Sequence, residues 1–196
     1  MSRWEPNARG RLERAALELY AERGFDQTTV AEIARRAGLR ERSFFRYFPD
    51  KREVLFWGQD ALREAYASAI ANAPAAAAPI DVVADGLNAA AAILDGRHGL
   101  ARQRAVIIAA NPELQERELL KRATLASAIA DALRRRGVTD LTASLAAESA
   151  IAIFKVAYAR WVDQSDEEDF GTFIVDALDH LKAMTAGHQG ASSAGE

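Results

Sequence analysis

Apolar residues recur at helical spacing along most of this chain, and no stretch shows the strict apolar/polar alternation of a half-buried strand. Glycine, proline and Asn-Pro punctuation separates the periodic stretches. The pattern therefore predicts an all-α fold of about nine helices, in the ranges 6–23, 29–37, 42–48, 50–71, 80–94, 97–110, 112–136, 141–163 and 167–184. Residues 187–196 lack periodicity and are expected to form a disordered tail.

The second and third predicted helices have the signals of a helix-turn-helix. Thr29 and Glu32 form a T-x-x-E capping box, which predicts a helix start. Gly38 follows the last turn of that helix, where a positive φ is least costly. The next element, Arg42–Phe48, is very short because Pro49 blocks its continuation. In a DNA-binding helix-turn-helix, this second helix lies in the major groove.

The composition of the short helix suits DNA contact. Phe44 and Phe48 are four residues apart and are expected to pack inward together. Arginine can bind guanine or phosphate, and hydroxyl groups can bind phosphate. The alternative is an ordinary helical hairpin with a solvated basic face. The residues left to face outward are Arg42, Ser43, Arg46 and Tyr47.

The same region resembles the tetracycline-repressor (TetR/AcrR) family of regulators. The resemblance is carried by Ala16–Leu19, Gly24-Phe25, Thr28–Val30, Ile33-Ala34, Ala37–Leu39 and Phe44–Lys51. It implies a homodimeric, all-helical regulator with an N-terminal three-helix DNA-binding head and a C-terminal domain for ligand binding and dimerisation. Most such proteins are repressors that a small ligand releases from DNA.

The resemblance also implies roles for individual residues. It places Thr29 on a phosphate and Lys51 on the DNA backbone. This chain has Arg40 where the family often has a Ser or Thr cap, and Phe45 where a Tyr is common. Phe45 cannot donate to phosphate but could contact a thymine methyl. The residues implied at or near the groove are Arg40, Glu41, Arg42, Ser43, Arg46 and Tyr47.

Charge is unevenly distributed along the 196 residues. Through Leu55 there are 12 Lys and Arg against 9 Asp and Glu, and the rest of the chain has 13 against 19. A basic head on an acidic body is typical of nucleic-acid binding at one end. We therefore expect a DNA-binding domain over residues 1–50, a ligand-binding and dimerisation domain over residues 51–186, and a tail over 187–196.

Several function classes lack support in the sequence. There are no cysteines, which excludes disulfides and thiolate chemistry. The histidines His98, His180 and His188 are far apart, and no nucleophile-elbow or nucleotide-binding motif occurs. We expect no catalytic site, metal or cofactor. The N-terminus lacks a signal-peptide pattern and no apolar run is long enough to span a membrane, so we expect a cytoplasmic protein.

The last two predicted helices have stripes that could form a dimer interface. One helix offers small residues and the other offers bulky residues, so the two could interlock and pair with a second copy as a four-helix bundle. The alternative is burial within one subunit. The interface residues expected are Ala146, Ser149, Ala150, Ile153, Phe170, Phe173, Ile174, Ala177 and Leu181.

Aromatic residues in the body suggest a small-molecule pocket, with plain core as the alternative. Glu148 lies seven residues before Lys155, so each could be a ligand counter-charge, part of an intersubunit ion pair, or exposed. Asn111–Leu119 resembles a motif of family members that include acyl-CoA sensors, which adds acyl thioesters to the candidate ligands. The pocket residues expected are Phe56, Trp57, Asp60, Ile107, Glu148, Phe154, Tyr158 and Trp161.

These observations predict a ligand-responsive homodimer that binds a palindromic double-stranded DNA operator, most often as a repressor. Its partners would be the operator, a small-molecule effector and a second copy of the chain, with no membrane. The alternative is a DNA-binding protein that acts architecturally or through a protein partner, without a ligand.

Overall fold

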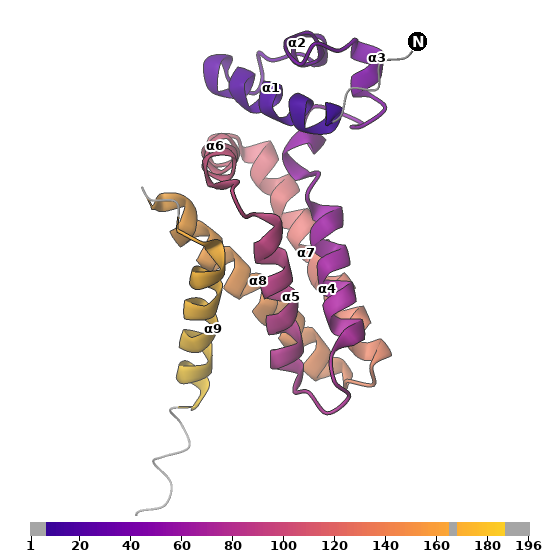
Figure 1. Cartoon of the computed structure of the whole chain (residues 1–196), viewed down its shortest axis with the longest axis vertical. Coiled ribbons are helices and arrows are strands. Elements are labelled where there is room, and N and C mark those ends of the chain that lie inside the picture. The colour runs from indigo at the N-terminus through magenta and orange to yellow at the C-terminus, as the bar shows by residue number, and fades with distance from the viewer. Residues whose placement is uncertain (1–6, 165–167, 187–196) are drawn as a thin grey trace, which may run out of the picture. The chain divides into compact units, whose positions relative to one another are not determined.

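The structure, a computed structural model, describes residues 7–164 and 168–186, and all regular structure in these ranges is helical (Figure 1). This confirms the all-α fold. The predicted start at Pro6, the Glu167 boundary and the 187–196 tail lie outside the described residues. The elements are α1 (Ala8–Arg23), α2 (Val30–Arg36), α3 (Glu41–Phe44), the 3₁₀ helix η1 (Glu53–Phe56), α4 (Gln59–Asn72), α5 (Pro79–Ile93), α6 (His98–Ala109), α7 (Pro112–Arg135), α8 (Asp140–Asp163) and α9 (Phe170–Ala186).

The helices form two compact units. The first takes in the described residues up to Asp60 together with Gly99–Lys121. The second takes in Ala61–His98 and the described residues from Arg122 onward. Helix α6 and the first turns of α7 thus belong to the same compact unit as the N-terminal helices. The predicted domain boundary at residue 50 had placed them in the other domain. The long helix α7 is continuous and contributes to both units.

The first unit is built around the apolar face of α1. That helix packs against α2 and η1, and α2 packs against α3. Leu12, Ile33 and Phe44 are fully buried, so one residue from each of the three N-terminal helices anchors a shared core. Leu114 of α7 is also fully buried in this cluster. The core therefore fixes the two helices of the helix-turn-helix on a rigid support.

The second unit has α5, α8 and α9 packed against one another. Trp161 of α8 is buried, and its indole nitrogen donates to the Glu168 carbonyl at 2.8 Å. Its ring centroid lies 4.9 Å from that of Phe170, which ties α8 to α9. Helix α8 is long and apolar enough to cross a membrane by length and composition, which corrects the expectation that no apolar run has this length. Within the chain, α8 packs against α5 and α9, and another side of it is exposed.

The predicted helix over 50–71 is divided in the structure. Asp50 Oδ1 accepts from the backbone nitrogens of Arg52 (2.8 Å) and Glu53 (3.1 Å), but the N-cap of η1 is Arg52, which makes no side-chain cap bond, so Asp50 is not the cap of α4. The chain then forms η1, turns at Trp57-Gly58 and begins α4 only at Gln59. Glycine has low helix propensity, and Phe56 is buried in the core of the first unit. Together they account for the break.

Candidate nucleic-acid interface

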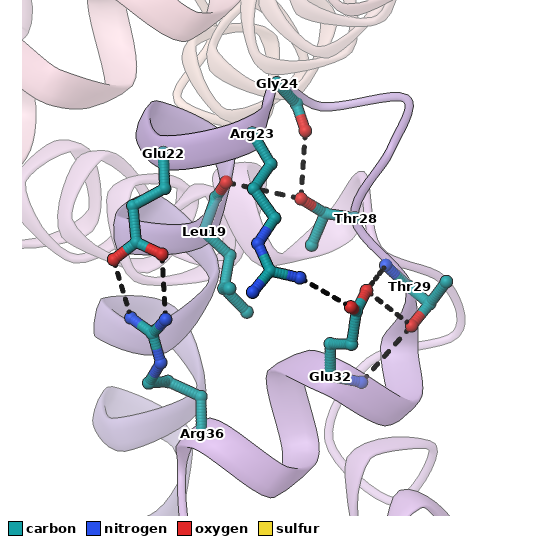
Figure 2. A network of polar contacts seen from close by, with 8 residues as sticks. All are labelled: Leu19, Glu22, Arg23, Gly24, Thr28, Thr29, Glu32 and Arg36. Atoms are coloured by element: carbon teal, nitrogen blue, oxygen red, sulfur yellow. Dashed lines mark hydrogen bonds and ion pairs between the residues drawn. The ribbon is translucent and has the colours of Figure 1, made fainter.

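The start of α2 is fixed by the predicted capping box. Thr29 Oγ1 accepts from the Glu32 nitrogen at 3.3 Å, and Glu32 Oε2 accepts from the Thr29 nitrogen at 3.0 Å (Figure 2). Arg23 of α1 adds an ion pair to Glu32 at 2.7 Å. Hydrogen bonds from the Thr29 backbone and hydroxyl, with the nearby Arg23 charge, hold the pKa of Glu32 below its usual range. The carboxylate therefore stays ionised where it caps the helix.

Two further contacts hold α2 on α1. The buried Thr28 hydroxyl donates to the Gly24 carbonyl at 2.9 Å and approaches the Leu19 carbonyl at 3.3 Å. Arg36 binds both carboxylate oxygens of Glu22, at 2.9 and 2.8 Å, a bidentate pair with directional geometry (Figure 2). The entry and the exit of α2 are thus both tied to the preceding helix.

The turn between α2 and α3 has the geometry that the sequence predicted. Gly38 has φ 69°, in the left-handed region, and the Leu39 nitrogen donates to the Ala34 carbonyl at 2.8 Å. Arg40 makes no side-chain cap bond to α3, as expected where Ser or Thr is absent. Helix α3 itself is only Glu41–Phe44, shorter than the predicted range 42–48, and residues 45–47 continue as a turn.

The inward packing of the two phenylalanines is confirmed. Phe44 and Phe48 are buried, with ring centroids 5.5 Å apart. This leaves a surface of arginines and one aromatic ring facing solvent. Arg40, Glu41, Arg42, Phe45 and Arg46 are exposed, and Ser43 and Tyr47 are half-buried.

Phe45 and Arg46 give this surface its particular chemistry. The Phe45 side chain is 53% exposed, which is unusual for a phenylalanine in a folded protein. Arg46 lies over the Tyr47 ring, 5.2 Å from its centroid, and its Nη2 donates to the Tyr47 hydroxyl at 3.2 Å. The surface therefore offers a pre-oriented guanidinium beside an exposed apolar ring.

Lys51, predicted to contact the DNA backbone, binds the loop before α2 in the structure. Its ammonium donates to the carbonyl oxygens of Phe25 (2.8 Å), Asp26 (3.2 Å) and Thr28 (3.0 Å), and lies 4.4 Å from the Phe25 ring centroid. The Tyr20 hydroxyl donates to the Lys51 carbonyl at 2.7 Å. An ammonium has three donors, and all three are used here. These bonds hold the loop before α2, and a contact of Lys51 with the DNA backbone stays a prediction.

Sequence reasoning also missed a charged cluster after the helix-turn-helix. Glu53 of η1 accepts two bonds from Arg117, at 2.8 and 2.6 Å, and one from Lys121 at 2.8 Å. Burial alone would raise the pKa of Glu53, but these bonds outweigh it and hold the pKa below its usual range. Arg104 of α6 donates to the Leu55 carbonyl at 2.6 Å. Helices α6 and α7 thus bind η1, the segment that follows the helix-turn-helix.

The eight residues predicted for the ligand pocket do not line one common cavity in the structure. Phe56 and Ile107 are buried in the core of the first unit, and Trp57 packs at its edge. Glu148 and Asp60 are exposed. Phe154, Tyr158 and Trp161 pack around Phe170 as an aromatic cluster of the second unit. The second unit does contain a cavity, between α4 and α7, and none of the eight predicted residues lines it.

The predicted dimer stripe is mostly buried within the chain itself. Because α8 packs on α9 and α5, the side chains of Ala146, Ala150, Ile153, Phe170, Phe173 and Ile174 are buried within the single chain, and those of Ser149, Ala177 and Leu181 are half-buried. This matches the alternative of burial inside one subunit. The exposed apolar residues of α8 lie on a different face, at Leu141, Leu145 and Val156.

A capped helix, a glycine turn and a short helix with exposed arginines define a helix-turn-helix DNA-binding protein. Comparison with known families agrees. The family model described as "Bacterial regulatory proteins, tetR family" matches residues 13–56, and the model described as "MftR C-terminal domain" matches residues 77–186, more than half of the chain. The chain therefore belongs to the tetR family of transcriptional regulators, which is not a family of enzymes.

Relatives match along most of the chain. The HTH-type transcriptional regulator TcmR of Streptomyces glaucescens is 27% identical over 188 residues, covering 89% of this chain and 82% of that protein. Thermus thermophilus FadR in complex with lauroyl-CoA has a TM-score of 0.54 at 24% identity, covering 96% of this chain and 100% of that one. Bacillus subtilis FadR in complex with stearoyl-CoA has a TM-score of 0.60 at 21% identity, covering 88% and 96%. At these identities the structural likeness shows the fold.

Proposed function

We propose that this protein is a cytoplasmic, homodimeric repressor that a small molecule releases from a palindromic operator. The observation that carries this proposal is the exposed surface of α3 and of the turn 45–47 that follows it, where Arg42, Phe45 and Arg46 face solvent while Phe44 and Phe48 are buried beneath them. Such a surface can offer guanidinium groups to guanine or phosphate and an apolar ring to a thymine methyl. The DNA contacts predicted for Arg40, Glu41, Ser43 and Tyr47 belong to the same proposal, with Thr29 at the start of α2.

The dimer would form through the exposed side of α8 rather than through the buried stripe. Leu141 is 71% exposed, Leu145 60% and Val156 51%. Their spacing of 4 and 11 residues places them on one helical face, and the exposed residues Ala152 and Ala159 fall on it as well. Large apolar side chains clustered in this way on a solvent-exposed helix face indicate a surface that binds a partner. A second copy of the chain is the occupant that we propose.

The charges of α8 support a two-fold arrangement. Glu148 and Lys155 are exposed on the same face, on either side of Ala152. If two α8 helices cross antiparallel at Ala152, Glu148 of one subunit faces Lys155 of the partner subunit, and the symmetry makes this pair twice. An isologous interface of this kind is self-complementary in charge. It corresponds to the intersubunit alternative for these two residues.

The two reading heads would then act together. A single helix-turn-helix reads few bases, whereas a dimer reads two half-sites about one helical turn, roughly 34 Å, apart. Ligand and operator would compete through linkage if the ligand favours a different spacing of the heads. Both helices that line the cavity of the second unit, α4 and α7, continue into the first. On α7, Leu125 of the cavity follows Lys121, a partner of Glu53, by one helical turn.

The alternative is a DNA-binding protein that has no small-molecule ligand. A fully packed second unit would favour that alternative, whereas a cavity in the second unit supports ligand control.

In vitro selection of DNA from a random pool by the full-length protein tests the proposal. We expect an inverted repeat whose half-sites are centred one helical turn, or a multiple of it, apart. Recovery of no enriched sequence, or of a single half-site bound by a monomer, would contradict it.

A further inference from the structure

Glu41, the first residue of α3, places a carboxylate on the reading surface, residues 40–47. Its side chain is exposed and forms no ion pair or hydrogen bond with another described residue. By contrast, Glu18, Glu22, Glu32 and Glu53 all bind arginine or lysine side chains. The phosphates of DNA repel an unpaired carboxylate and so lower its affinity for DNA of any sequence. A favourable contact of Glu41 with DNA must therefore be made with a base.

Glu41 shares one side of the reading surface with Phe45. Phe45 follows four residues later and, as the C-cap of α3, keeps a right-handed helical backbone with φ −65° and ψ −12°. Residues four apart in this conformation are neighbours on one face, with Cβ atoms about 5–6 Å apart. Arg42 and Arg46 are also four apart and form the adjacent row. The surface thus has a hydrogen-bond acceptor beside an apolar ring in one row and two guanidinium groups in the next.

The hydrogen-bonding capacity of an ionised carboxylate limits the bases that Glu41 can contact. It accepts and cannot donate, so in the major groove it fits only the amino groups of cytosine and adenine. The adenine amino group lies beside N7, an acceptor that repels a carboxylate, whereas the cytosine amino group has no acceptor beside it on the same base. Guanine O6 and N7 and thymine O4 are acceptors and would repel Glu41. Cytosine is therefore the base that this side chain selects.

We propose that Glu41 is a specificity-determining residue that requires a cytosine in each half-site of the operator, near a thymine contacted by Phe45. This inference rests on the proposed function, in which α3 and the turn after it read a DNA operator. One helical turn is about 5.4 Å long and base pairs are about 3.4 Å apart, so we expect the cytosine within about two base pairs of the thymine. Because Glu41 weakens binding to other sequences, it widens the difference in affinity between the operator and non-specific DNA.

Glu41→Gln tests this inference by a change of base preference rather than by a loss. In vitro selection with the full-length protein should recover a cytosine at one position of each half-site. Glutamine has both a donor and an acceptor and pairs with adenine N6 and N7, so Glu41→Gln should shift that position from cytosine toward adenine. Glu41→Ala should show no preference there and keep the preferences at the other positions.

Affinity for DNA of random sequence gives a second readout. Both Glu41 variants should bind it roughly 2- to 5-fold more tightly than the unaltered protein, because a charge that the phosphates repel is removed. Glu116→Gln is the matched control, since it removes an exposed carboxylate of α7. It should leave both the preferred bases and the affinity for random DNA unchanged.

An operator with one modified base measures the contact itself. N4-methylcytosine keeps its pair with guanine but replaces the amino hydrogen that faces the major groove by a methyl group. At the selected position it should weaken binding of the unaltered protein at least about 5-fold and leave binding of Glu41→Ala unchanged. The same modification of a cytosine outside the half-sites is the control. An unaltered cytosine preference in both variants, or full binding of the modified operator by the unaltered protein, would overturn the proposal.

Two outcomes separate this inference from its alternatives. If Glu41 only stabilises the start of α3 through the helix dipole, Glu41→Gln should lower the melting temperature and weaken all sequences alike, which would contradict a role in base selection. If the unaltered protein enriches no sequence, the proposed function fails and this inference fails with it. An enriched operator whose bases do not depend on residue 41 contradicts this inference alone.

Discussion

The Lys51 ammonium lies 2.8 Å from the Phe25 carbonyl oxygen, which ties the end of the helix-turn-helix to the loop before α2. Since the Asp26 and Thr28 carbonyls take its other donors, Lys51→Ala should remove one hydrogen bond from each of three carbonyls, of which the Phe25 carbonyl keeps its bond from the Thr28 nitrogen. We expect a loss of about 2 kcal/mol in the free energy of unfolding, measured by urea denaturation.

DNA binding gives a second readout for Lys51→Ala. If Lys51 positions the loop and touches no phosphate, the slope of log affinity against log salt should be unchanged where the variant is folded. The control is Arg52→Ala, which breaks an exposed pair with Asp50 and should cost less than about 1 kcal/mol. If the variant has normal stability and its slope of log affinity against log salt falls by about one unit, Lys51 contacts a DNA phosphate.

The charge pattern of α8 predicts the behaviour of two charge reversals. Glu148→Lys would place lysines opposite each other at the proposed two-fold axis, and Lys155→Glu would do the same with glutamates. Each single variant should raise the dimer dissociation constant at least about tenfold in analytical ultracentrifugation, and the double variant should recover most of the loss. If the single variants dimerise as tightly as the unaltered protein, the interface does not lie on this face of α8.

The ion pairs of Glu53 predict a stability effect that depends on pH. Glu53→Gln removes the charge that Arg117 and Lys121 bind, so we expect a loss of about 1–2 kcal/mol at pH 7. The pKa of Glu53 is lowered in the folded state, so its contribution is present above the unfolded value of about 4.3 and is lost as pH falls through the folded value. The difference in urea midpoint should therefore shrink between pH 7 and about pH 3. The exposed Glu116 of α7 gives the control Glu116→Gln, and a difference for Glu53→Gln that does not change with pH would rule out the carboxylate charge as its cause.

The features that could be predicted from the sequence are local ones. The Thr29 and Glu32 cap, the Gly38 turn and the Phe44 and Phe48 pair each depend on residues within a few positions of one another, where backbone geometry follows from residue type. The break at Gly58 was missed, because the apolar period continues across it while burial of Phe56 decides the local geometry.

The features that could not be predicted depend on distant partners. Glu53 meets Arg117 and Lys121 across 64 and 68 residues, and no periodicity reports such a pair. The stripe on α8 left two interpretations open for the same reason, since a stripe shows that something covers it but not whether α9 or a second copy does so; the structure buries most of it within the chain. The cavity of the second unit has no sequence signal, because the residues that line it come from two helices, α4 and α7, that are far apart in the chain.

Operator affinity of Arg42→Ala and Arg46→Ala tests the central claim most directly, because both arginines are exposed on the proposed reading surface. The operator would be the sequence recovered by in vitro selection, and affinity would be measured by fluorescence anisotropy at fixed salt. If an arginine reads a base, its loss should weaken binding by about 1–3 kcal/mol and relax specificity at that position. The control Arg134→Ala removes an exposed arginine of the second unit and should bind normally. Full affinity and unchanged specificity in both variants would contradict the account of α3 and the turn after it as the surface that reads DNA.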